Sequence, residues 1–245
     1  MTEQANIVKT MIATISQVAT PPVQTLPAPT TQTKTHVPTI SGPNLDQLAT
    51  LMQGVGTWNE WRQQNPQIKP NLNKAELKEI NLTEVNFRQS KLIKANLEKS
   101  ILIKANLSLA VLKEAILTMA DLLQANLKRA NLEKAKLIEA NMRQARLVEA
   151  KLENAILRKA KLNLANLKGA NLSQANLMGA NLKKANLTNA NLRGANLTNS
   201  YLIGANLTMA DLTEAILTNA KYDSTTKWPE GFDPVKAGVK LIIVS

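Results

Sequence analysis

The sequence predicts an all-β solenoid, in which the chain winds into a square coil of stacked parallel strands, and three observations support this prediction. A large apolar residue stands at every fifth position from Leu72 to Leu217, thirty in all; twenty-eight are leucine and the others are Phe87 and Met142. A small residue, nearly always alanine, stands two residues before each of them. Asparagine is the commonest residue between the two, so the repeating unit is A-N-L-x-x.

A spacing of five residues fits neither an α-helix nor a flat strand. In a helix, a five-residue step rotates each leucine by roughly 140° from the last, so no apolar stripe forms. In a strand, side chains alternate between the two faces, so an odd step sends successive leucines to opposite faces. If each unit instead turns the chain by about a quarter of a circle, every leucine points to a common axis, and the strands of successive coils stack about 4.8 Å apart.

The turns between units are predicted to differ along the chain. The last residue of the unit is the position that needs a positive φ in a type II turn, which favours glycine and asparagine. These residues occur only in the C-terminal half, with glycine at 169, 179, 194 and 204 and asparagine at 154, 189, 199 and 219. We therefore expect type II turns in the C-terminal half, and turns without a positive φ in the earlier coils.

This pattern resembles the pentapeptide-repeat protein family over residues 70–219, in units such as Ala175-Asn176-Leu177-Met178-Gly179. The resemblance implies a right-handed quadrilateral parallel β-helix, in a family that is abundant in photosynthetic bacteria and whose members mostly lack an assigned role. Some members imitate duplex DNA and inhibit topoisomerases. That mimicry requires a strongly acidic rod, and this chain has a net charge of +12, so the resemblance does not carry topoisomerase inhibition over to it.

A solenoid needs a cap at each end, because its core is otherwise open to water. Residues 44–69 are predicted to form the N-terminal cap, with a short helix, interruptions expected at Gly54 and Gly56, and Trp58-Asn59-Glu60-Trp61 lying over the first coil. Residues 1–43 are predicted to be a disordered or weakly helical tail, because the second half of this segment is a linker rich in proline and threonine.

The repeats are predicted to form the β-helix over residues 70–221, followed by a C-terminal cap and tail over residues 222–245. Trp228 and Phe232 lie in a proline-containing, loop-like stretch of this cap. The apolar residues 241–244 are expected to add a final strand.

Catalytic chemistry is not indicated, and we predict that the protein is not an enzyme and holds no cofactor or metal. There is no cysteine, no glycine-rich phosphate loop, and a single histidine, His36, in the proline-threonine linker. Glu133 and Glu153 fall one coil apart, but a pair on a convex surface lacks the pocket that tunes an acid and a base. A column of asparagines is interpreted as a structural ladder: it comprises Asn86, Asn106, Asn126, Asn166, Asn186 and Asn206.

The outward charges are unevenly divided among the four sides of the coil, which we name by their first large residue as sides Leu72, Leu77, Leu82 and Phe87. The adjacent sides Leu82 and Phe87 together carry ten basic and three acidic residues, a net charge of +7. Such a surface suits phosphate groups, although the scarcity of aromatic residues disfavours single-stranded nucleic acid. The candidate anion-binding residues are Arg88, Lys128, Arg129, Arg143, Arg146, Lys161 and Lys168.

A second candidate surface is apolar and lies around the corner between sides Leu77 and Leu82. It is either a patch for a protein partner or ordinary strand filling. Its residues are Ile101, Ile103, Leu123, Ile116 and Met119. The leading hypothesis is a non-catalytic protein-interaction scaffold in the cytoplasm, the compartment expected because no secretory signal is visible. The alternative is binding of nucleic acid or an anionic membrane through the basic sides.

Overall fold

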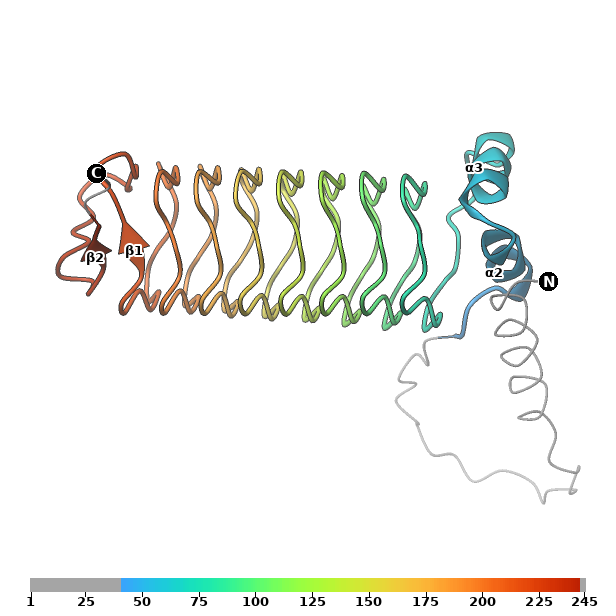
Figure 1. The fold of residues 1–245 in the computed structure, drawn as a ribbon, viewed down its shortest axis with the longest axis horizontal. Coiled ribbons are helices and arrows are strands. Elements are labelled where there is room, and N and C mark those ends of the chain that lie inside the picture. Colours follow the sequence, from blue (N-terminus) through green and yellow to red (C-terminus); the bar gives the residue numbers. More distant parts are fainter. Residues whose placement is uncertain (1–40, 243–245) are drawn as a thin grey trace, which may run out of the picture. The chain divides into compact units, whose positions relative to one another are not determined.

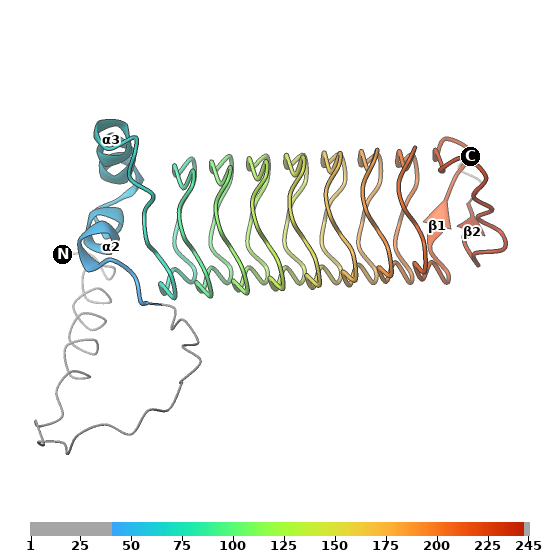
Figure 2. The same ribbon diagram turned by 180° about the vertical axis from the view of Figure 1, so that it is seen from behind.

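The computed structural model describes residues 41–242. Two helices, α2 (Leu45–Met52) and α3 (Val55–Gln64), precede the repeats. A two-residue parallel pair, β1 (Lys221–Tyr222) with β2 (Lys240–Leu241), follows them. Between the helices and this pair the chain forms a row of stacked coils, which Figures 1 and 2 show from opposite sides. The predicted all-β solenoid with a helical N-terminal cap is confirmed, whereas the predicted tail lies, up to residue 40, outside the described residues.

Each coil contains four units of five residues, as predicted. Parallel bridges join a residue to the one twenty positions later, from Asn71 with Lys91 to Tyr201 with Lys221. Strands in one coil therefore pair with the same side of the next coil, and side chains twenty residues apart form columns along the rod.

In units that have asparagine before leucine, such as the one at Asn166, every backbone N–H group has a partner, which explains the composition of the unit. The N–H groups of Asn166, Leu167 and Gly169 donate to carbonyl oxygens of neighbouring coils at 2.9, 2.7 and 2.9 Å. The Ala170 N–H closes the turn onto the Leu167 oxygen at 2.9 Å. The remaining donor, the Lys168 N–H, bonds the side-chain oxygen Oδ1 of Asn166 at 3.1 Å. Asparagine is thus favoured before leucine because it satisfies the one N–H that the ladder leaves free.

The core is the predicted leucine column. All thirty large residues from Leu72 to Leu217 are buried, and even Leu212, the least covered, is only 9 % exposed. Alanine fills the second inward position, as in Ala145 and Ala165, which are at most 1 % exposed. The aliphatic core therefore runs without interruption from one end of the repeats to the other.

The prediction that positive-φ turns are confined to the C-terminal half is wrong. The last residue of every unit has a positive φ, from Lys74 at 57° through Leu109 at 60° to Asn219 at 57°. This conformation suits the ladder, because at nearly every corner the N–H of this residue donates to the next coil, as from Lys74 to the Ile93 oxygen at 2.8 Å. A corner with different backbone angles would turn this donor away from its acceptor. The repeated inter-coil bonds therefore impose the left-handed conformation even where a side chain makes it cost about 1–2 kcal/mol.

The N-terminal cap closes the first coil with aromatic residues. Gly54, with φ of 124°, separates α2 from α3, while Gly56 lies inside α3 and does not interrupt it. Trp58 is completely buried, and its ring packs edge-on against Phe87 with centroids 5.7 Å apart. Its Nε1–H donates to the Asn86 oxygen at 2.9 Å. The segment Trp58-Asn59-Glu60-Trp61 is therefore part of a helix that covers the exposed end of the core.

The C-terminal end changes the register of the ladder by one residue. Tyr201 pairs with Lys221, twenty positions on, but Asn206 pairs with Lys227, twenty-one positions on. Asp223 bridges the altered corner, because its Oδ1 accepts the Gly204 N–H at 3.0 Å, the donor that pairs with a carbonyl in other coils. Burial opposes ionisation of this carboxyl, but hydrogen bonds from Thr225, Gly204 and Thr226 outweigh it and lower the pKa of Asp223.

Two aromatic contacts and a short strand complete the C-terminal end. Trp228 stacks on Phe232 with centroids 5.0 Å apart and meets Tyr222 edge-on at 5.6 Å. The predicted final strand is present as β2, which contains Leu241. Residues 243 and 244 of that prediction lie outside the described residues.

The uniform corner geometry predicts how one corner responds to substitution. A Cβ added at Gly169 (φ 64°) would meet no atom closer than the Glu149 Cγ at 3.6 Å, so only the backbone conformation is strained. We expect Gly169→Val to lower the free energy of unfolding by about 1–2 kcal/mol, because a β-branched residue resists positive φ. Gly169→Asn is the control and should cost clearly less. Equal losses in denaturant unfolding would contradict the argument.

The bridging role of Asp223 predicts a local, pH-dependent loss of stability. Asp223→Ala should lower the free energy of unfolding by about 1.5–3 kcal/mol, because it removes a charged acceptor from the final corner. Since the folded pKa is lowered, this contribution is complete above the ordinary aspartate pKa of about 3.9 and disappears as the pH falls below it. Glu230→Ala removes an exposed carboxylate from the same cap. If both variants unfold alike at neutral pH, Asp223 has no special role.

Candidate interaction surfaces

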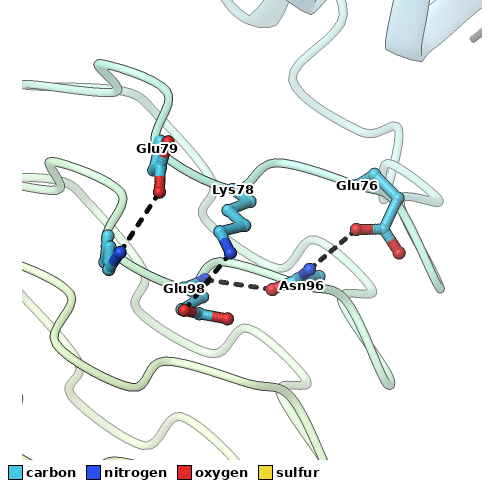
Figure 3. A network of polar contacts seen from close by, with 6 residues as sticks. Glu76, Lys78, Glu79, Asn96 and Glu98 are labelled. Carbon is cyan, nitrogen blue, oxygen red and sulfur yellow. Dashed lines mark hydrogen bonds and ion pairs between the residues drawn. The ribbon is translucent and has the colours of Figure 1, made fainter.

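Ion pairs between adjacent coils are concentrated in the first half of the repeats. Figure 3 shows one network, in which Lys78 pairs with Glu98 at 3.3 Å and the Asn96 side chain donates to Glu76 at 2.8 Å. Further pairs between residues twenty apart extend along the rod: Lys99–Glu79, Lys94–Glu114, Lys104–Glu84, Lys113–Glu133, Arg129–Glu149 and Lys159–Glu139. These pairs are solvent-exposed, so they organise the surface charge more than they stabilise the fold.

The two carboxylates that fall one coil apart do not form an acid–base pair. Glu133 binds Lys113 at 2.8 Å, and Glu153 accepts the Asn171 amide at 2.6 Å. The hydrogen bond from Lys113 lowers the pKa of Glu133, whereas a general acid at neutral pH needs a raised one. The pair is a surface contact.

Most cations in the second half of the repeats have no carboxylate partner among residues 41–242. Residues 154–210 contain seven lysines and arginines and no acidic residue. Within the described residues, only Lys159 and Arg193 of these seven reach a carboxylate, those of Glu139 and Glu214. The other five, free of ion pairs in this part of the chain, are Arg158, Lys161, Lys168, Lys183 and Lys184.

The candidate anion-binding residues therefore fall into different settings. Arg129 is paired with Glu149 and is already neutralised. The Arg143 Nε donates to Asn163 at 3.2 Å and keeps its charge uncompensated. Arg88 lies in the first coil, where its backbone oxygen accepts from Arg62. The remaining candidates are exposed and form no ion pair among residues 41–242: Lys128, Arg146, Lys161 and Lys168.

One aromatic contact on side Leu82 was not predicted from the sequence. The Nζ atoms of Lys183 and Lys221 lie 5.6 and 4.8 Å from the centroid of the Tyr201 ring. These lysines come from the coils before and after that of Tyr201, so they approach the ring from both directions along the rod. The spacing of twenty residues between Tyr201 and Lys221 could have predicted this contact from the sequence.

The apolar candidates differ in how much of each side chain reaches solvent. Met119 is 52 % exposed and Ile101 is 38 % exposed, while Ile103, Leu123 and Ile116 are half-buried. Other exposed apolar residues were missed: Leu109, Leu164 and Met209 occupy the positive-φ corner position, as Met119 does. Their shared position at the end of the unit could have predicted this exposure, because a side chain at a convex corner has few neighbours.

Neither a metal centre nor a membrane-crossing helix occurs within residues 41–242. No three histidine or acidic side chains in this part of the chain come together to bind a metal ion. Neither α2 nor α3 has the length and apolar character that a membrane-spanning helix needs. His36 lies outside the described residues.

Comparison with known protein families identifies the class of protein. The model for pentapeptide repeats matches in overlapping segments, residues 71–108, 80–118, 105–144, 145–183 and 180–219. The chain belongs to the pentapeptide-repeat family, and its fold is the right-handed quadrilateral β-helix of that family. Proteins of this family are generally non-catalytic binding proteins.

Several solved structures are similar in sequence over part of the chain. The pentapeptide-repeat protein alr5209 from Nostoc PCC 7120 is 36 % identical, covering 46 % of this chain and 84 % of that one, with a TM-score of 0.21. HetL, a pentapeptide-repeat protein involved in the regulation of heterocyst differentiation in Nostoc sp. strain PCC 7120, is 29 % identical, covering 66 % and 92 %, with a TM-score of 0.24. Rfr23 from Cyanothece 51142 is 43 % identical, covering 42 % and 63 %, with a TM-score of 0.25. A comparison with curated proteins gave no match.

Proposed function

We propose that this protein is a non-catalytic scaffold that binds a protein partner at the corner between sides Leu77 and Leu82. The observation that carries the proposal is the exposure of Met119 and Ile101, at 52 % and 38 %, together with the half-buried Ile116 on side Leu77 and the half-buried Ile103 and Leu123 on side Leu82. Exposed aliphatic side chains that gather on a rigid surface mark sites where another protein excludes water. The cytoplasmic location expected from the sequence remains a prediction.

The rigidity of the corner supports binding without a large cost in ordering. Met119 has a φ of 57°, and its N–H donates to the Ile138 oxygen at 2.9 Å, so its backbone is fixed by the ladder. Ile101 is bridged to Asp121 in the next coil. A surface held in this way loses little backbone freedom when it binds.

The chain provides a matched control for this proposal. Ile101→Asp with Met119→Asp places two charges on the proposed patch. Ile216→Asp with Met209→Asp makes the same changes at a second isoleucine and a second corner methionine, which are 50 % and 73 % exposed. The partner is first identified by photo-crosslinking through a reactive residue at position 119, and its affinity for the purified variants is then measured.

We expect the first pair to weaken partner binding at least tenfold, since charges at an apolar contact must be desolvated, and the second pair to leave it nearly unchanged. Unaltered thermal unfolding would show that both variants are folded. Equal binding by the two variants would refute the proposed patch.

A second candidate function is binding of nucleic acid or an anionic membrane through sides Leu82 and Phe87. It is favoured by the acid-free stretch of residues 154–210, whose unpaired cations lie mostly on these two sides. Salt-sensitive retention on immobilised heparin would test for such a surface, because counterion release makes contacts with a polyanion strongly salt-dependent. Passage through heparin at low salt would rule it out.

A further inference from the structure

The unpaired cations of sides Leu82 and Phe87 spread over these two adjacent sides in three successive coils. Lys183 and Lys184 stand at the corner between the two sides, Lys161 lies in the middle of side Leu82, and Lys168 lies at the far end of side Phe87. Arg143 and Arg146 extend the cluster into the preceding coil. We call these six residues the basic corner. All six are exposed, and none forms an ion pair with another described residue.

Carboxylates on the preceding coils of these two sides compensate little of this charge. On side Leu82, Asp121 accepts the neutral Asn141 amide at 2.8 Å and keeps its own charge, which is one against the six cations. On side Phe87, Glu149 is bound by Arg129. The basic corner therefore keeps its positive potential, which attracts phosphate groups.

The neighbouring aromatic residue does not favour a single-stranded nucleic acid. Such ligands bind by stacking bases on open aromatic rings. Tyr201 lies one coil beyond Lys183, and the ammonium groups of Lys183 and Lys221 already lie over its ring at 5.6 and 4.8 Å. The ring is therefore engaged by cations, and the contacts that remain available are with phosphate.

An exposed aliphatic residue at the corner favours a lipid surface over a nucleic-acid duplex as the ligand. Leu164 is 49 % exposed and shares its corner column with Lys184, twenty residues on. Against the sugar-phosphate backbone this side chain has no apolar partner, whereas at a bilayer it can enter the boundary between headgroups and acyl chains. Clustered cations beside an inserted apolar side chain are a typical way for proteins to bind anionic membranes.

We propose that the basic corner binds the phosphate headgroups of an anionic bilayer, with Leu164 entering its interface. This inference rests on the second candidate function and names its ligand. The corner is straight, because parallel bridges such as Arg146 with Asn166 and Lys161 with Asn181 keep successive coils in register. Arg143 and Lys183, forty residues apart, therefore lie in one column, and the other cations lie in the columns beside it.

The test uses the full chain with two sets of charge reversals that change the net charge equally. Lys161→Glu, Lys168→Glu and Lys183→Glu alter the basic corner. Lys91→Glu, Lys136→Glu and Lys151→Glu alter exposed lysines of sides Leu72 and Leu77 that also lack an ion pair in the described part of the chain. Binding is measured by co-sedimentation with vesicles of phosphatidylcholine alone and of phosphatidylcholine mixed equally with phosphatidylglycerol, at low and high salt.

We expect the unaltered chain to bind only the vesicles that contain phosphatidylglycerol, and more weakly at high salt. The corner variant should lose at least about tenfold in vesicle affinity, and the control variant should lose much less, because the contribution of a cation falls off within a Debye length of the membrane. Leu164→Ser should weaken vesicle binding severalfold without changing retention on heparin.

Three results would overturn the proposal. If the two triple variants lose vesicle affinity equally, net charge alone drives binding. If the chain binds heparin or duplex DNA through the basic corner but not anionic vesicles, the second candidate function stands and the bilayer is the wrong ligand. If it binds none of these, both the bilayer proposal and the second candidate function fail.

Discussion

The conformation of the units depends on backbone hydrogen bonds between adjacent coils, which join segments about twenty residues apart. Nearly every corner N–H points along the rod to its acceptor, as from Lys74 to Ile93 at 2.8 Å, and all corners share the same positive φ. This explains why lysine, glutamate and leucine occupy a conformation that glycine and asparagine prefer. The ladder also leaves one N–H per unit without a partner, and the side chain of asparagine satisfies it, as at Asn166.

The same ladder arranges the side chains of the repeat in columns on the surface of the rod. Because side chains twenty residues apart lie in adjacent coils, charge along the sequence becomes a pattern of pairs on the rod. In the first coils opposite charges meet, as Lys78 meets Glu98. From residue 154 to residue 210 no carboxylate is present to meet the cations. One continuous core therefore supports a first half in which cations and carboxylates are mixed and a later stretch that contains cations alone.

A rigid, convex rod of this kind suits binding better than catalysis, since catalysis needs groups enclosed and shielded from water. The apolar patch and the basic corner adjoin on side Leu82, because Leu123 of the patch and Arg143 of the basic corner stand twenty residues apart in one column. The patch occupies the earlier coils and most of the basic corner the later ones. If both proposals hold, the rod would bring a protein close to a membrane surface.

By itself the sequence determined the coil and the core, because these depend on which way each residue faces within a five-residue unit. The spacing from Leu72 to Leu217 was sufficient for that purpose. Only the tertiary structure decided the backbone angles at Lys74 and Leu109, the pairing of Arg129 with Glu149, and the lysines over Tyr201. Each of these depends on atoms about twenty residues away, so it is settled by contact between coils and leaves no trace in the local repeat.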